Sequence, residues 1–147
     1  MKHVRKSVLL WFSPRQIYDL VVAVEDYPRF LPWCADAQVL QRDADGMTAR
    51  LTMKALGMRH SFTTRNDHIV GDEVRMRLVD GPFSELAGGW RFVPLDDGRA
   101  CRVEFELRYA FSSATLAAVI TPVFERIADT LVDSFVKRAE DVYGSGA

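Results

Sequence analysis

Residues 101–111 read CRVEFELRYAF and lead into residues 113–143, SATLAAVITPVFERIADTLVDSFVKRAEDVY. In the first segment every second residue from Val103 to Tyr109 is apolar and the residues between them are charged, which predicts a strand with one apolar face. The second segment predicts a long amphipathic helix ending at Tyr143. Its apolar stripe, at spacings of three and four, is Leu116, Ile120, Val123, Phe124, Ile127, Leu131, Phe135, Ala139 and Val142. Such a helix must cover a sheet, and a curled sheet leaves room for a lined cavity.

The N-terminal third predicts a strand, a helix and an apolar connector. Alternating apolar residues indicate a strand over residues 2–12. The following Ser13-Pro14-Arg15-Gln16 is typical of a helix start, with a serine cap and glutamine at the capping-box position. Residues 27–34, YPRFLPWC, contain two prolines and predict a loop or a single helical turn. This connector is unusually rich in large apolar side chains.

The middle of the chain predicts an antiparallel sheet. Strands are expected at residues 37–41, 47–56, 58–70, 73–79 and 86–95, separated by turn signals. Gly88-Gly89 predicts a bulge or sharp bend that lets the sheet curl. Pro122 predicts a bend or break in the last helix. The expected fold class is α+β: a curved seven-stranded antiparallel sheet wrapped around a long C-terminal helix, in the order β-αα-β6-α.

Length, charge and cysteine content limit the class of protein to which this chain can belong. The 147 residues are 48% hydrophobic, which suits one ligand-binding domain over residues 1–147. The net charge of −1 gives no global case for a nucleic-acid binder. Cys34 and Cys101 have no metal or redox spacing, and two free thiols are the plainer interpretation, with a single disulfide as the alternative. No segment approaches the length of a membrane span, so the expected location is the cytoplasm.

Four segments in order resemble one family. These are residues 27–34 (YPRFLPWC), 62–66 (FTTRN), 79–90 (VDGPFSELAGGW) and 135–143 (FVKRAEDVY). Together they resemble the coenzyme Q-binding and ribosome-association toxin (RatA) family of the START-like superfamily, also called polyketide cyclase/dehydrase-like. The resemblance runs from about residue 4 to residue 143. It implies a helix-grip fold and a role in binding polyprenyl quinones in support of respiration. For the RatA-like members it also implies binding to the large ribosomal subunit. It carries no catalytic set.

A polyprenyl ligand needs a long, mostly carbon-lined slot with one or two polar groups at its head. The apolar residues expected to line it are Phe30, Leu31, Trp33, Phe62, Phe83, Leu86, Trp90, Phe124, Ile127 and Leu131. Each of them is also a candidate for ordinary core packing. Phe30 and Trp33 lie in the connector, which suggests a mobile gate or a knob for a partner. Asp80 is either a polar group near the ligand or a turn residue.

Arginines gather on the charged faces of the strands. Strand alternation places Arg59, Arg65, Arg75 and Arg77 outside the sheet, with Arg50, Lys54, Arg91, Arg102 and Arg108 on the same face. Only Glu73, Glu104 and Glu106 share this face by the same alternation. Such a surface suits phosphates of ribosomal RNA or of a membrane surface. An ordinary solvated face with cross-strand ion pairs is the alternative.

Residues suited to catalysis are scarce. His3, His60 and His68 have no neighbours at metal-ligand spacing, and no nucleophile motif is present. His60 is a candidate to face inward beside Phe62 and donate to a ligand carbonyl, or to be structural. We therefore expect no metal, no required cofactor and no enzymatic activity. The expected function is binding of ubiquinone or a related polyprenyl lipid. The alternatives are a toxin that binds the large ribosomal subunit and blocks subunit association, and a cyclase-like enzyme.

Overall fold

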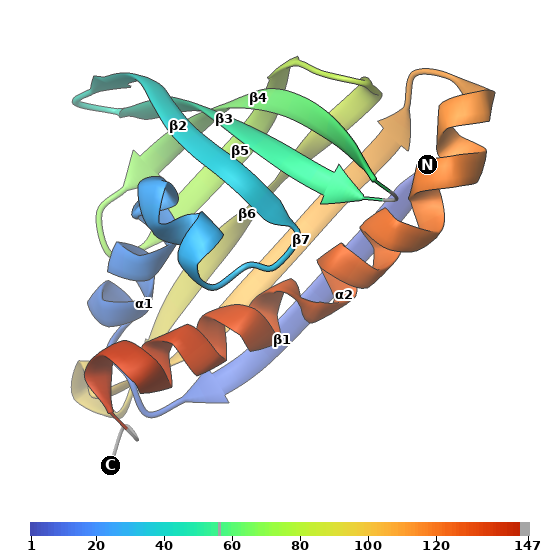
Figure 1. Ribbon diagram of the computed structural model, residues 1–147. Coiled ribbons are helices and arrows are strands. Elements are labelled where there is room, and N and C mark those ends of the chain that lie inside the picture. Colours follow the sequence, from blue (N-terminus) through green and yellow to red (C-terminus); the bar gives the residue numbers. More distant parts are fainter. Residues whose placement is uncertain (56, 145–147) are drawn as a thin grey trace.

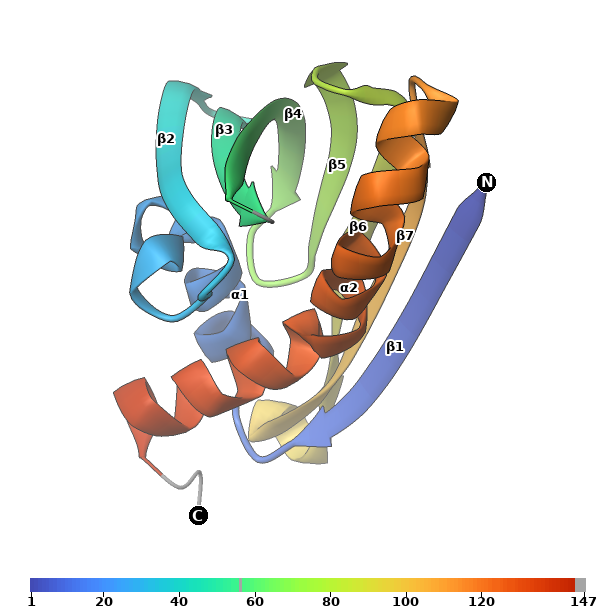
Figure 2. The same cartoon turned by 45° about the vertical axis from the view of Figure 1, so that its right-hand side comes forward.

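The computed structural model describes residues 1–55 and 57–144 and has the predicted helix-grip architecture. One antiparallel sheet of seven strands, in the order β1-β7-β6-β5-β4-β3-β2, curls around α2 (Figures 1 and 2). The strands are β1 (Lys2–Leu10), β2 (Cys34–Asp43), β3 (Gly46–Ala55), β4 (Met58–Ile69), β5 (Glu73–Asp80), β6 (Phe83–Leu95) and β7 (Ala100–Phe111). The helices are α1 (Pro14–Val22), the 3-10 turns η1 (Val24–Arg29) and η2 (Asp96–Gly98), and α2 (Ala114–Tyr143). Leu56, predicted as the end of a strand, lies outside the described residues.

The start of α1 has the geometry that its sequence predicts. The Ser13 hydroxyl accepts a hydrogen bond from the Gln16 backbone N–H at 3.1 Å, and the Gln16 side chain accepts one from the Ser13 N–H at 2.8 Å. This capping box satisfies two backbone donors that would otherwise lack partners. At the other end of the chain, the Tyr143 hydroxyl donates to the Gln16 carbonyl at 2.9 Å. The first helix is thereby tied to the end of α2.

The two long C-terminal elements pack as their patterns predict. All four apolar residues of β7 from Val103 to Tyr109 are buried. On α2 the buried residues are Ile120, Phe124, Ile127, Ala128, Val132, Phe135 and Ala139. Val142, predicted in the apolar stripe, is 47% exposed because it lies beyond the part of the helix that the sheet covers. The helix is not broken at Pro122, which lies inside it, but its axis changes direction along its length in both views (Figures 1 and 2).

Gly88 and Gly89 do not form a bulge. Both pair in regular register with β5 and β7, and the register shift of β6 lies between Phe83 and Glu85. The glycines are needed because the neighbouring backbones come close. A Cβ added to Gly88 would lie 2.2 Å from the Glu106 carbonyl oxygen, and one on Gly89 would lie 2.5 Å from that of Val74.

The core consists of two clusters of buried side chains. The larger joins α1 and α2 to β6 and β7, and the smaller lies under η1, β2 and β3. Cys101 belongs to the first cluster and Cys34 to the second, and both thiols are free, so the disulfide alternative is wrong. Burial raises the pKa of each thiol to about 11, which keeps both protonated near neutral pH.

Candidate functional site

A cavity of about 90 Å³ lies between the sheet and α2, where the two core clusters meet. Every strand from β3 to β7 contributes to it, together with η1, the connector and α2. The lining residues are Val24, Tyr27, Leu31, Trp33, Ala49, Leu51, Phe62, Thr64, Asn66, Met76, Leu86, Trp90, Phe105, Leu107, Phe124, Ile127, Ala128, Leu131 and Phe135. Almost all of these side chains are hydrocarbon, so the cavity suits an apolar guest.

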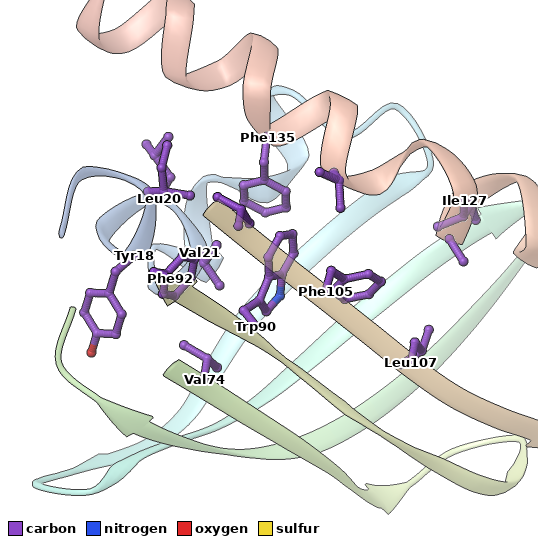
Figure 3. Close-up of a cluster of buried hydrophobic side chains, with 14 of the residues drawn as sticks. Tyr18, Leu20, Val21, Val74, Trp90, Phe92, Phe105, Leu107, Ile127 and Phe135 are labelled. Carbon is purple, nitrogen blue, oxygen red and sulfur yellow. The ribbon is translucent and has the colours of Figure 1, made fainter. Parts of the chain in front are cut away.

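Aromatic side chains form one end of the cavity. Figure 3 shows Phe135 pointing from α2 toward Trp90 on β6, with Phe105 beside it on β7. The ring centroids of Trp90 and Phe105 are 4.7 Å apart, and those of Trp90 and Phe135 are 5.1 Å apart. Such contacts between tilted rings stabilise a fixed arrangement. This end of the cavity is therefore a rigid wall.

The connector covers another side of the cavity. Tyr27 packs against Phe135 with ring centroids 5.5 Å apart, and its hydroxyl donates to the Val21 carbonyl. Loss of solvation raises the pKa of Tyr27 above its ordinary value. Leu31 is completely buried, and the Trp33 carbonyl accepts a hydrogen bond from the Lys54 N–H at 2.8 Å. The backbone is thus anchored on both sides of Pro32, and opening of this cover requires rotation of side chains.

One polar pair stands out in the lining. Thr64 and Asn66 both point inward from β4 and are 8% and 7% exposed. The Thr64 hydroxyl donates to the Asn66 side-chain oxygen at 2.7 Å. Because this bond occupies the hydroxyl proton and the amide oxygen, the amide NH₂ is the group of this pair best suited to donate to a guest.

Eight of the ten predicted lining residues line the cavity: Leu31, Trp33, Phe62, Leu86, Trp90, Phe124, Ile127 and Leu131. Phe30 and Phe83 do not. Phe30 packs on Phe135, with the guanidinium of Arg138 over its ring at 5.1 Å. Phe83 stacks on Phe111 at 4.9 Å and lines a neighbouring crevice instead.

Several residues that line the cavity were not predicted from the sequence. Leu51, Met76, Phe105 and Leu107 were visible only as inward positions of their strands, the same signal as for any core residue. Thr64 and Asn66 carried a more specific signal. They continue the inward alternation from Phe62, and polar residues on an apolar strand face are unusual.

His60 and Asp80 lie near the cavity but do not line it. His60 faces inward beside Phe62 and lines the neighbouring crevice. Its buried Nε2 atom has no hydrogen-bond partner among residues 1–55 and 57–144. Asp80 is exposed, is the last residue of β5 and lies opposite Thr63 on the outer side of the sheet, so it does not reach the cavity. The adjacent Gly81 packs on Phe62, because a Cβ there would lie 2.7 Å from the Phe62 Cβ.

The outer face of the sheet holds a groove of about 790 Å³ over β1, β5, β6 and β7. The glycines of β6 contribute to its floor, and its walls alternate in charge. Four of its arginines lie within 4.0 Å of a glutamate: Arg75 of Glu73, Arg91 of Glu104, and both Arg5 and Arg108 of Glu106. Asp67 also lines it, contrary to the expectation of three acids only. The surface is therefore less basic than predicted.

Arg65 differs most from its predicted role as a free phosphate ligand. Its side chain is only 16% exposed and binds both carboxylate oxygens of Asp43, at 2.8 and 3.0 Å, as well as Asp67 at 3.1 Å. These hydrogen bonds lower the pKa of Asp43 to about 2, so the pair stays charged at neutral pH. Arg59, Arg75 and Arg77 are exposed.

A helix-grip sheet around a carbon-lined cavity defines a START-like protein, and comparison with known proteins agrees. The profile of the polyketide cyclase / dehydrase and lipid transport family matches residues 11–136. The chain belongs to this family, and within it to the coenzyme Q-binding and ribosome-association toxin group. It is 39% identical to the "Ribosome association toxin RatA" of Pseudomonas aeruginosa, covering 97% of this chain and 98% of that protein. It is 30% identical to the mitochondrial "Coenzyme Q-binding protein COQ10 homolog B" of Xenopus laevis, covering 95% of this chain and 58% of the relative.

Solved structures show the same fold. A START superfamily protein from Mycobacterium smegmatis matches with a TM-score of 0.80 at 20% identity, covering 95% of this chain and 98% of that one. The Streptomyces aromatase/cyclase Zhui matches with a TM-score of 0.77 at 18% identity, covering 95% and 93%. At these identities the likeness concerns the fold alone. Over residues 1–55 and 57–144 no helix is both long and apolar enough to cross a membrane.

The fluorescence of Trp33 is expected to change when a ligand binds in the cavity. It is partly exposed and lines the cavity, so a bound molecule will change its surroundings. In a Trp11→Phe, Trp90→Phe background we expect its emission to shift or to be quenched as a short-chain ubiquinone is added. An unchanged spectrum at a ligand concentration that saturates binding by calorimetry would mean that the connector only packs.

Proposed function

We propose that this protein binds a hydrophobic molecule without catalysis, ubiquinone or a related polyprenyl lipid, in the cavity between the sheet and α2. The observation that carries the proposal is the lining itself, hydrocarbon on nearly all sides with one inward polar pair. The name of the Xenopus relative supports a quinone. A cyclase-like enzyme would need an acid or base beside its substrate. The lining residues include no carboxylate, imidazole, amine or thiol, and the hydroxyl of the lining Tyr27 donates to the Val21 carbonyl, which supports a binding role.

The size of the cavity adds a requirement. Sites for drug-sized ligands usually measure about 300–1,000 Å³, and this one measures about 90 Å³. Side chains must therefore move to admit a quinone with its tail. Met76, Leu131 and Trp33 are suited to this, because methionine is flexible and the other two are partly exposed.

We infer that the quinone ring lies against the polar pair of Thr64 and Asn66. Asn66→Leu is expected to weaken binding of a short-chain ubiquinone about tenfold, the value of one hydrogen bond to a buried polar group. Binding of squalene, a hydrocarbon with no acceptor, should be unchanged. Titration calorimetry with both ligands measures this. An equal loss for both would mean that Asn66 shapes the cavity and does not bind the ring.

A second candidate function is association with the large ribosomal subunit, supported by the names of the bacterial relatives. The contact surface would be the outer sheet face around Arg59, Arg75 and Arg77, whose side chains are exposed. Arg65 would not contact phosphates directly, because its guanidinium is already paired with Asp43 and Asp67.

Reversal of charge on β5 tests this second candidate. Arg75→Glu with Arg77→Glu should weaken co-sedimentation with large subunits at least tenfold. It should also reduce the slope of log K against log salt concentration by about two, because about two phosphate contacts are lost. Arg15→Glu with Lys137→Glu makes the same change in net charge on α1 and α2 and should bind normally. If wild-type protein failed to co-sediment at low salt, ribosome association would be excluded.

A further inference from the structure

The tip of the β3–β4 hairpin carries two cations side by side. Lys54 and Arg59 are directly opposite each other in the register of the two strands, and both are exposed. Neither lies in an ion pair with an acid among residues 1–55 and 57–144. Like charges directly opposite on a sheet are destabilising. This arrangement therefore favours an anion from outside the protein, which would relieve the repulsion.

Exposed apolar side chains lie on the same hairpin and on two other segments, β5 and α2. Met58, beside Arg59 in the same turn, is 54% exposed. Val79 is 57% exposed because it follows the inward-facing Leu78 and so points outward by strand alternation. It is also the unpaired residue between two partners of β4, Thr63↔Asp80 and Thr64↔Leu78. Val119 on the first half of α2 is 47% exposed.

These segments meet at one end of the molecule. The crevice beside the cavity is lined by Met53 and His60 from the hairpin, Pro82 from the β5–β6 turn, and Leu116 and Ile120 from α2. Figure 1 shows the β3–β4 turn and the start of α2 at the end of the molecule away from α1 and the C-terminus. Met58 is two residues before His60, Val79 is three before Pro82, and Val119 is next to Ile120, so the exposed apolar residues lie on the segments that line this crevice.

We propose that this end of the molecule docks on an anionic lipid surface. Lys54 and Arg59 contact lipid phosphates, and Met58, Val79 and Val119 enter the interfacial layer. An RNA backbone would satisfy the cations but would give the aliphatic side chains no apolar partner, so the lipid fits both features. Asp36 lies near the start of β2 opposite Thr52, one outward position from Lys54, but its carboxylate accepts a hydrogen bond from Gln38 at 3.0 Å and forms no ion pair with Lys54 or Arg59. Asp80 lies beside Val79 at the end of β5.

Docking in this orientation would also turn the cavity toward the lipid. Phe62 lines both the crevice and the cavity, so it is the side chain that separates them. A rotation of Phe62 would connect the lipid surface with the interior. This step rests on the proposed function of the cavity, whereas the docking itself does not.

Vesicle flotation tests the docking. Wild-type protein should float with phosphatidylcholine vesicles that contain phosphatidylglycerol, more weakly at high salt, and poorly with phosphatidylcholine alone. Lys54→Glu with Arg59→Glu should lower partitioning about thirtyfold or more, at about fivefold or more for each basic residue. Met58→Ser should lower it severalfold. Arg15→Glu with Lys137→Glu, which changes net charge equally at the other end, should float as wild type does.

The proposal would be overturned by a lack of flotation of the wild type at low salt, or by flotation of Lys54→Glu, Arg59→Glu protein equal to that of the wild type. Loss of flotation in the Arg15→Glu, Lys137→Glu control would also overturn it, because binding would then follow net charge. Leu131→Glu protein should float normally although its cavity is changed. If the wild type floats but binds no quinone, the docking stands and the proposed ligand does not.

Discussion

Leu131→Glu is expected to lower the affinity for a short-chain ubiquinone at least a hundredfold. Leu131 lines the cavity from α2 and is only partly buried, so the carboxylate can reach water in the empty protein. A guest in the cavity would remove that water, and an unpaired charge in hydrocarbon surroundings is strongly unfavourable. Titration calorimetry on protein shown by circular dichroism to be folded measures the loss.

Two matched variants show whether the loss arises in the cavity. Thr130→Glu places the same charge on the exposed side of α2, one residue earlier, and should bind as wild type does. Leu131→Met keeps the size and apolar character of the side chain and should bind within about threefold. Wild-type affinity in a folded Leu131→Glu protein would contradict the position assigned to the ligand.

Gly88→Ala should destabilise the protein by about 3 kcal/mol, at the upper end of overpacking effects. The added methyl group would lie 2.2 Å from the Glu106 carbonyl oxygen, so β6 and β7 must separate at the centre of the sheet. Urea unfolding measures the change. Gly98→Asn is the control, because a Cβ at Gly98 has no atom within 4 Å and asparagine tolerates its φ of +84°. Equal stability of wild type and Gly88→Ala would mean that the strands are not held this closely.

The fold was predictable because its signals are local. Alternation along β7 and the three-and-four spacing on α2 each fix which face is buried, and Ser13 with Gln16 marks the start of α1. Positions decided by tertiary contact were not predictable. The glycines of β6 predicted a bulge or a sharp bend, but glycine is required there because the backbones of Val74 and Glu106 approach closely from the neighbouring strands.

The candidate site was predicted in part for the same reason. Inward positions such as Trp90 and Ile127 follow from periodicity, and both line the cavity. Phe30 lies in the connector, where no period fixes the direction of a side chain, and it packs on Arg138 instead. The pairing of Arg65 with Asp43 joins residues on different strands, and alternation shows only that Arg65 faces outward.

Mass spectrometry of lipids extracted from the protein, purified without detergent, shows whether the cavity holds a polyprenyl lipid. We expect a quinone or other polyprenyl lipid to co-purify with wild-type protein. The same lipid should be absent from Leu131→Glu protein and present in Thr130→Glu protein prepared in parallel. Wild-type protein with no polyprenyl lipid above the amount found with Leu131→Glu would mean that the cavity is not a polyprenyl-lipid site.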